Sequence, residues 1–132
     1  MNPFDFVPKH KSDVSGIPQL ARLRDEEIQP VIPHLLEWIQ DMNWPVAQEV
    51  LNILAARQNL VESCLPGILR TEEKDSIWKY WIISELLPRF EKPLSEELLA
   101  TLRRITQQPN QDEVLEEVDR MARKYLKCCG NC

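Results

Sequence analysis

Residues 32–47, IPHLLEWIQDMNWPVA, decide the fold of this chain. Their apolar residues recur at helical spacing before a short polar turn at 41–43 interrupts the pattern. Asn43 is a suitable N-cap for a following helix that has a proline in its first turn. The stretch therefore predicts the end of one helix, a tight turn and the start of a second helix, with Trp38 and Trp44 on either side of the turn.

A second copy of this pattern follows at residues 65–81, LPGILRTEEKDSIWKYW. Pro33 recurs as Pro66 after 33 residues, and Trp44 recurs as Trp78 after 34 residues. A third unit is weaker because its first helix has no proline. Self-similarity at this period indicates helical hairpins that stack, since one hairpin alone buries only part of its apolar surface.

The rest of the chain also shows helical periodicity, and no segment alternates polar and apolar residues as a strand would. Asp75 or Ser76, Ser95 and Asn110 are suitable N-caps, and Asn110 with Glu113 forms a capping-box pattern. In the last helix we expect the stripe that includes Val114 and Leu115 to be buried. The class is all-α, with helices expected over about 15–24, 25–40, 45–55, 60–70, 77–87, 95–108 and 110–127.

A helix with a proline in its middle, an acidic turn and a second helix that opens on apolar and small residues resembles the HEAT repeat. The small residues and tyrosines typical of the tetratricopeptide repeat are absent. We therefore expect an α-α superhelix of about three HEAT-like hairpins behind a short N-terminal helix. The expected organisation is an extended arm at 1–12, one helical-repeat domain at 13–127 and a flexible cysteine-rich tail at 128–132.

Three segments narrow the resemblance: VPKHKSD at 7–13, LLEWIQDMNWPVAQEV at 35–50 and IWKYWII at 77–83. Together they resemble a bacterial family of small HEAT-like proteins that is known only as a domain of unknown function. The likeness covers residues 7–126 approximately, and the tryptophan-rich turns are its specific part. It implies the superhelical fold, and it supplies no catalytic residues to carry over.

Composition limits the classes of function. The net charge of −5 and the sequence pI near 5.1 argue against nucleic acid, because phosphate-binding proteins usually carry a basic surface. No apolar run approaches the roughly 18 residues of a membrane span, and the N-terminus lacks the apolar core of a signal peptide. We therefore expect a cytoplasmic protein with reduced thiols, no membrane partner and no cofactor.

Aromatic and polar residues around the two turns form the candidate site. Because Trp44 and Trp78 are each expected to open the second helix of a repeat, they could line a groove with Trp81. In the alternative, equivalent indoles fill the same gap between repeats and bind their N–H groups locally, and Trp38 is expected in the core. The predicted binding residues are Trp44, Gln48, Glu49, Trp78, Lys79 and Trp81.

No catalytic or metal-binding pattern accompanies this site. Neither His10 nor His34 has a histidine or carboxylate at i+4, so no helical metal pair is present, and no nucleophile motif is present. Cys128, Cys129 and Cys132 could bind a soft metal or form a disulfide, but a terminal tail without a fourth ligand favours an incidental role.

Two functions remain open. The leading hypothesis is a non-enzymatic module that binds a protein or peptide on its concave face, with an antitoxin-like or immunity-like inhibitor as one version. The alternative is a small-ligand binder or enzyme with a pocket between repeats, lined by Trp44, Trp78 and Lys79 and using Glu49 as acid or base. A deep pocket with a buried charged pair would favour the second hypothesis.

Overall fold

The computed structural model describes residues 2–70 and 75–128, and all of the regular structure within these ranges is helical. Three of the elements are longer than eight residues: α4, α8 and α10. In chain order the elements are η1 (Pro3–Phe6), α1 (Ile17–Arg22), α2 (Asp25–Ile28), η2 (Gln29–Val31), α3 (Ile32–Leu36), η3 (Glu37–Ile39), α4 (Ala47–Ala55), α5 (Gln58–Val61), η4 (Glu62–Cys64), α6 (Leu65–Arg70), α7 (Ser76–Trp81), η5 (Ile82–Leu86), η6 (Leu87–Arg89), α8 (Glu96–Gln107), α9 (Gln111–Leu115) and α10 (Val118–Cys128).

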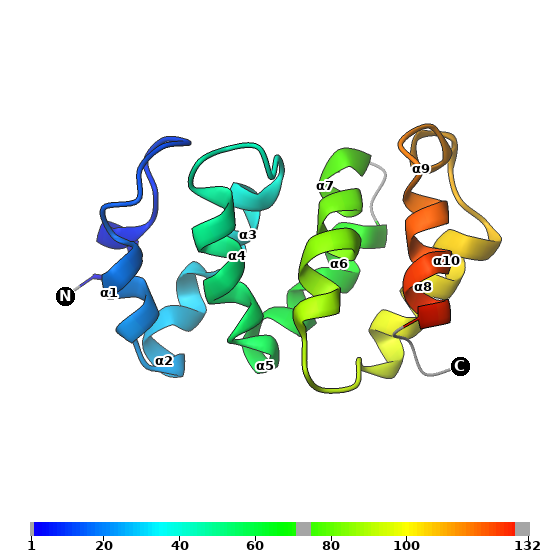
Figure 1. The fold of residues 1–132 in the computed structure, drawn as a ribbon. Helices are drawn as coiled ribbons and strands as arrows, with labels where there is room; N and C mark the ends of the chain where they lie inside the picture. Colours follow the sequence, from blue (N-terminus) through cyan, green and yellow to red (C-terminus); the bar gives the residue numbers. More distant parts are fainter. Residues whose placement is uncertain (1, 71–74, 129–132) are drawn as a thin grey trace.

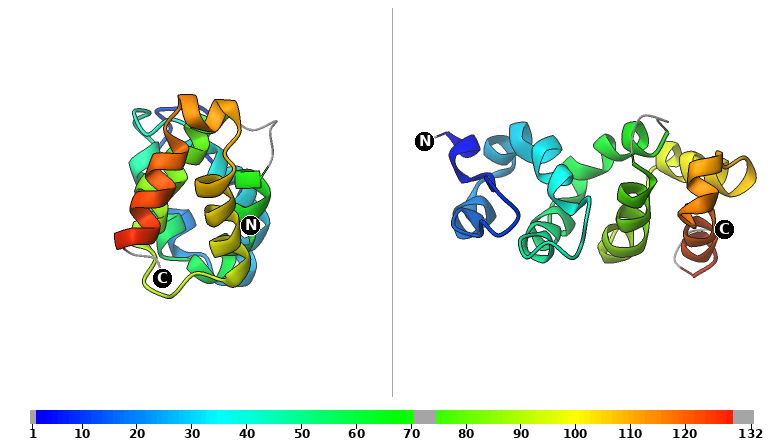
Figure 2. Two further views of the ribbon diagram at one scale, coloured as in Figure 1. Left: turned by 90° about the vertical axis from the view of Figure 1, so that its right-hand side faces the viewer. Right: turned by 90° about the horizontal axis from the view of Figure 1, so that it is seen from above.

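The helices form two layers that run along the molecule, with the chain ends at opposite ends of the row (Figures 1 and 2). In one layer α1 contacts α4, α4 contacts η5, and both α7 and η5 contact α10. In the other layer α3 contacts α5, and α6 contacts α8. The chain passes between the layers at each turn, so that successive helical hairpins lie side by side.

The 33-residue period appears directly in the helix boundaries. The series α2, η2, α3 begins at Asp25, and the series α5, η4, α6 begins 33 residues later at Gln58. In both series a tight 3-10 turn precedes the helix that carries Pro33 or Pro66 in its first turn. Proline is tolerated there because its missing N–H would have no helical partner. Pro33 therefore lies at a change of helix type, just after the 3-10 turn η2 passes into α3.

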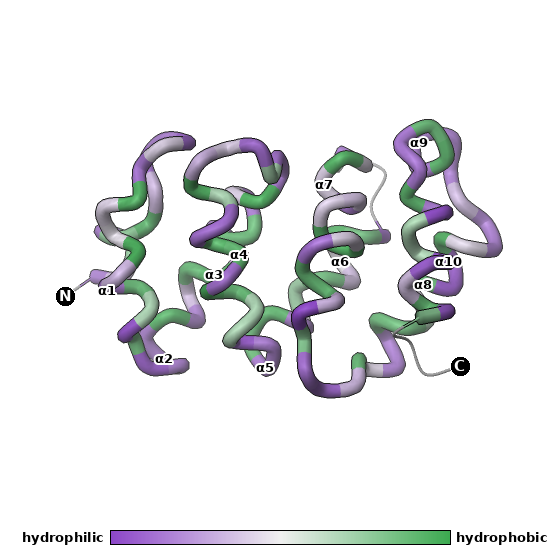
Figure 3. Tube along the Cα trace, in the orientation of Figure 1, coloured by the Kyte–Doolittle hydropathy of each residue, from purple (hydrophilic) through white to green (hydrophobic). Residues whose placement is uncertain are grey.

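The core is a continuous apolar cluster drawn from both layers, and Figure 3 shows apolar residues recurring along the helices of each layer. Polar side chains join neighbouring hairpins at the edge of this cluster. Asn59 donates to Asp25 at 3.0 Å, and the Ser95 N–H donates to Glu62 at 2.6 Å. Because these bonds span one repeat, each hairpin is aligned with the next.

The N-terminal segment packs against the helical row and contains a helical turn at Pro3–Phe6, whereas an extended arm was expected. Pro8 is buried, and the carbonyl of Lys11 accepts the Val46 N–H at 2.9 Å. The contact is tight at Gly16, where an added Cβ would clash with the carbonyl oxygen of Phe6. Hydrogen bonds from Ser15 and from the Lys9 N–H lower the pKa of Asp13 to about 2, so this turn is held by a carboxylate.

Three of the predicted caps are confirmed. Asp75 accepts the Ile77 N–H at 2.7 Å, Ser95 accepts the Leu98 N–H at 3.2 Å, and Asn110 exchanges bonds with Glu113 in a capping box.

The expected cap at Asn43 is wrong. The Asn43 N–H donates to Asp41 within the turn, and α4 begins only at Ala47. The Val46 N–H just before α4 is satisfied by the carbonyl of Lys11, so the N-terminal segment supplies a partner that the turn was expected to supply.

The last predicted helix is two helices. Glu117 has φ of 61°, in the left-handed region, and this residue ends the turn that follows α9. Val114 and Leu115, which were expected to be buried, are 49% and 70% exposed, whereas Glu113 is fully buried. The break reorients α9 relative to α10, so a helical stripe drawn through both helices points to the wrong residues.

Candidate functional site

The six predicted binding residues do not form one groove. Trp78 and Lys79 are buried, whereas Trp44 and Trp81 are half-buried and line two different hollows. Gln48 and Glu49 are exposed on α4. The structure thus separates a sealed internal pair from two surface regions.

Trp78 lies within α7 and is only 5% exposed. Its indole N–H donates to the carbonyl of Leu36 at 3.0 Å, across the seam to the preceding hairpin. Trp44 lies in the turn before α4, so the two tryptophans are not equivalent as the repeat pattern had suggested. Trp78 fills a gap between hairpins and bonds locally, which is the alternative stated for the indoles.

Lys79 belongs to a buried ionic network. Its Nζ lies 2.9 Å from Oε2 of Glu113, and both side chains are fully buried. Arg104 forms bidentate hydrogen bonds with the same carboxylate and also donates to the carbonyl of Leu69 at 2.9 Å. The network therefore joins α6, α7, α8 and α9.

The Glu113 carboxylate is held in its ionised form. Burial raises its pKa, but hydrogen bonds from Arg104, the Asn110 N–H and Lys79 outweigh burial, and the pKa lies below the ordinary value. A buried carboxylate saturated by donors has no free oxygen with which to accept a substrate proton. Lys79 and Glu113 are thus placed to hold helices together, and neither faces solvent.

Trp81 lines a hollow of about 370 Å³ between α7–η5 and α10. We call this the η5–α10 hollow; its apolar walls come mainly from Tyr80, Trp81, Ile83, Pro88, Met121 and Tyr125. The rings of Tyr80 and Trp81 meet edge-to-face, with centroids 5.4 Å apart. Ser84, Glu85, Lys124 and Cys128 complete the lining.

The backbone beside this hollow is a π-helix, η5. Such wide turns are uncommon and often occur at functional sites because they reposition the side chains that follow. Here Ser84 and Glu85 lie within the wide turn, and the buried Ser84 hydroxyl has no hydrogen-bond partner among the described residues. The π-helix thus carries two of the polar residues of the η5–α10 hollow.

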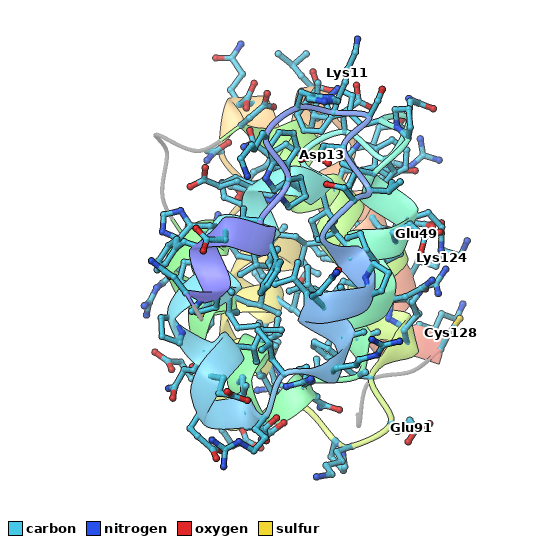
Figure 4. The ribbon with its side chains drawn as sticks, turned by 90° about the vertical axis from the view of Figure 1, so that its left-hand side faces the viewer. Lys11, Asp13, Glu49, Glu91, Lys124 and Cys128 are labelled. Atoms are coloured by element: carbon cyan, nitrogen blue, oxygen red, sulfur yellow. The ribbon has the colours of Figure 1, made fainter. Side chains whose placement is uncertain are left out.

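Glu49 and Lys124 project from the same side of the molecule in Figure 4, together with Cys128. Glu49 belongs to α4, and Lys124 and Cys128 belong to α10. Gln48 donates to Asn52 along the exposed side of α4 at 3.5 Å. Lys124 and Cys128 also line the η5–α10 hollow with Trp81, so this hollow opens on the side of the molecule from which Glu49 projects.

Trp44 lines a second hollow, of about 340 Å³. Its ring meets the ring of Trp38 edge-to-face at 5.8 Å and 66°. Trp38, which was expected in the core, is half-buried. We call this the Trp38–Trp44 hollow; its lining is Val7, Pro8, His34, Glu37, Trp38, Gln40 and Trp44.

Sequence reasoning missed several residues of these sites. Glu113 was recognised as a cap but not as the partner of Lys79, although the two are 34 residues apart, which is one repeat. Met121 and Lys124 face the η5–α10 hollow from a helix read only as an amphipathic end piece. The repeat period could have indicated the Lys79–Glu113 pair. Met121 and Lys124 could be assigned to the hollow only from the packing of α10 on η5.

The remaining candidates give no metal or membrane site. Within residues 2–70 and 75–128, no group of histidine, cysteine or acidic side chains is arranged to hold a metal ion. Cys129 and Cys132 of the tail lie outside the described residues. In the same described ranges, none of the helices combines the length and apolar character needed to cross a bilayer.

Comparison with known proteins agrees with the extent of the fold. The profile of one family, the domain of unknown function DUF5071, matches residues 6–126, which include both hollows and the buried ionic network. No curated protein matches the chain. The match covers most of the sequence, and the chain therefore belongs to the DUF5071 family.

Proposed function

We propose that this chain is a non-enzymatic interaction module that binds a protein partner on the exposed side of α4, α7–η5 and α10, the second helices of the hairpins, which form the concave face of the proposed superhelix. The observation that carries the proposal is the η5–α10 hollow, where a half-buried tryptophan and a tyrosine border a space of about 370 Å³. Tryptophan and tyrosine are frequent anchors of protein interfaces, and methionine is enriched at their buried cores. Trp81, Tyr80 and Met121 are therefore the expected anchors.

Charges around the hollow support a specific partner. Glu85 and Lys124 both line it, and neither forms an ion pair within the described residues. Charges of this kind steer association and select the partner more than they add affinity. With a net charge of −5, the chain favours a basic partner, which suits the antitoxin-like or immunity-like version of the proposal.

The alternative function, a ligand binder or enzyme with a pocket lined by Trp44, Trp78 and Lys79, has weaker support. A buried charged pair does exist, but Lys79 and Glu113 are fully buried, and Trp78 is 5% exposed. An acid or base must reach its substrate within hydrogen-bond distance, and the fully buried Lys79 and Glu113 do not reach solvent. The buried pair therefore does not support an active site.

The repeat architecture, the bacterial source and the cytoplasmic location are also proposals. The recurrence of the α2–α3 series in the α5–α6 series, and the side-by-side hairpins, support a HEAT-like α-α superhelix. The resemblance of the tryptophan-rich turns supports a bacterial, cytoplasmic protein that works without nucleic acid or membrane.

Affinity capture with matched variants tests the proposed surface. The tagged protein, its Trp81→Ala variant and a Leu115→Ala control are compared by mass spectrometry of the proteins that co-purify from the host lysate. Leu115 is 70% exposed and lies outside the η5–α10 hollow, so it controls for loss of an exposed apolar side chain. We expect one stoichiometric partner that Trp81→Ala loses and Leu115→Ala retains.

Circular dichroism melting curves establish that both variants are folded. A partner retained by Trp81→Ala would contradict the proposed surface, and a retained small molecule with no protein would favour the alternative.

A further inference from the structure

The Trp38–Trp44 hollow is a second aromatic site, separate from the proposed surface. Its two indoles are half-buried and meet edge-to-face, so each leaves ring surface exposed at the hollow. The other wall comes from Val7 and Pro8 of the N-terminal segment. Residues from three parts of the chain thus converge on one space of about 340 Å³.

Local bonds hold this site in place. The Trp44 N–H donates to the Asp41 carbonyl at 3.1 Å, and Asp41 also accepts the Asn43 N–H at 2.8 Å. On the opposite wall Pro8 is buried, and the Lys11 carbonyl accepts the N–H of Val46 beside the turn. These bonds fix the backbone of the turn that carries Trp44 before any ligand arrives, which reduces the entropy lost on binding.

The electrostatics of the hollow favour a positive ligand. Aromatic faces carry negative potential and attract cations, tryptophan most strongly. Glu37, also in the lining, is exposed and forms no ion pair within residues 2–70 and 75–128. Among the residues that the structure describes, the lining has no lysine or arginine, and its one basic side chain, His34, packs edge-to-face with Phe4 at 5.1 Å. The η5–α10 hollow differs, because Lys124 lies in its lining.

From these observations we infer that the Trp38–Trp44 hollow binds an organic cation, and that the cation is the arginine or lysine side chain of a protein partner. Two tryptophan rings would contact the flat guanidinium or the ammonium, and Glu37 would pair with its charge. The assignment of the cation to a protein partner rests on the proposed function. The assignment of the hollow as a cation site does not.

Small probes test the site without the partner. The side-chain N–H signals of the four tryptophans are followed by ¹H–¹⁵N NMR while a blocked Gly-Arg-Gly peptide is added. The matched control is the same peptide with citrulline, which keeps the shape of arginine and lacks its charge. We expect only Trp38 and Trp44 to shift, with a dissociation constant on the order of 10 mM, as for two cation–π contacts with an exposed ion pair. Trp78 and Trp81 serve as internal controls.

Variants assign the contacts. Trp44→Leu keeps an apolar side chain and should weaken binding about tenfold, while Glu37→Gln should weaken it about threefold. Asp112→Asn removes an exposed carboxylate on α9, outside the lining, and should change nothing. An unchanged Trp78 signal establishes that each variant is folded, because this indole is bonded in the core.

Three results would overturn the inference. Equal shifts with the citrulline peptide would show an apolar hollow with no preference for charge, and no shift at about 100 mM, tenfold above the expected constant, would exclude the site. Tetramethylammonium bound tenfold more tightly than the arginine peptide would exclude a protein side chain as the source. The NMR titration contains no partner protein, so a negative result there would not bear on the capture experiment that tests Trp81.

Discussion

Two consecutive residues of α7 face opposite neighbours and make different kinds of seam. Trp78 packs toward the preceding hairpin through an apolar contact with one neutral hydrogen bond, to the Leu36 carbonyl. Lys79 turns toward the following hairpin and meets Glu113 in a fully buried ion pair. The same helix thus uses area burial on one side and charge pairing on the other, and only the second should respond strongly to pH.

The largest effect is expected from Trp78→Ala in the apolar seam. Removing a buried indole leaves a cavity and removes its hydrogen bond to the Leu36 carbonyl, and we expect a loss of about 3–5 kcal/mol in the free energy of unfolding. Trp44→Ala is the matched control: it truncates a half-buried ring outside the helices and should cost about half as much. Urea denaturation measures both, and equal losses would contradict the distinction between the two tryptophans.

Glu113→Gln breaks the ionic seam while preserving its shape. The positive charge of Lys79 would remain buried without its counter-charge, and we expect a loss of about 3 kcal/mol. Glu117→Gln, at an exposed pair with Arg120, should cost less than about 1 kcal/mol. A comparable loss at both positions would mean that burial of the Lys79–Glu113 pair has no special weight.

The pH dependence follows from the same carboxylate. The pKa of Glu113 in the folded protein lies below its ordinary value of 4.5, so its stabilising contribution is fully present above pH 4.5 and is lost as pH falls through the lower folded value. The difference in stability between the wild type and Glu113→Gln should therefore shrink below pH 4.5. Urea midpoints at pH 7 and at pH 3 measure it, with Trp78→Phe as the control that should keep a constant difference.

Replacing both charges should cost less than replacing one. The double variant Lys79→Met, Glu113→Leu removes the buried ions together, and such replacements are often neutral or stabilising. Arg104, whose side chain is 31% exposed, can then turn to solvent, while the Asn110 N–H loses its partner. We expect unfolding free energy within about 2 kcal/mol of the wild type. A double variant less stable than Glu113→Gln would show that the network stabilises beyond its charge balance.

The smallest effect is expected at Glu117, beside the ionic seam. A non-glycine residue with φ of 61° costs about 1 kcal/mol, and glycine removes that strain. Loss of the exposed pair with Arg120 offsets only part of the gain. Glu117→Gly should therefore raise the unfolding free energy by a few tenths to about 1 kcal/mol. A clear loss in thermal melting would contradict the strain argument.

The helical class and the caps at Asp75, Ser95 and Asn110 were predictable because they depend on residues close in sequence. The repeat of the first helices was predictable because Pro33 and Pro66 mark the same turn in both copies. The pairing of Trp44 with Trp78 failed because the second helices begin at different distances from their tryptophans. Sequence spacing alone does not report where a helix starts.

The candidate sites were less predictable. Trp81, Gln48 and Glu49 do lie at the surface, and helical spacing indicated their positions on α4 and α7. The burial of Lys79 was not visible, because its partner Glu113 lies on α9, which ends before a break at Glu117 that no glycine or proline marks. The Trp38–Trp44 hollow was also missed, since one of its walls comes from the N-terminal segment.

Chemical modification of the buried Lys79 amine would report local opening of the helices around it. Acylating reagents modify a lysine only when its nitrogen reaches solvent, and Lys79 is fully buried, whereas Lys124 and Lys127 are exposed. Brief labelling of the native protein should therefore mark the α10 lysines and spare Lys79. The rate at which label appears at Lys79 would depend on how often α7 separates from α9. Mass spectrometry of the peptide that contains Lys79 would therefore give the local opening rate of the ionic seam.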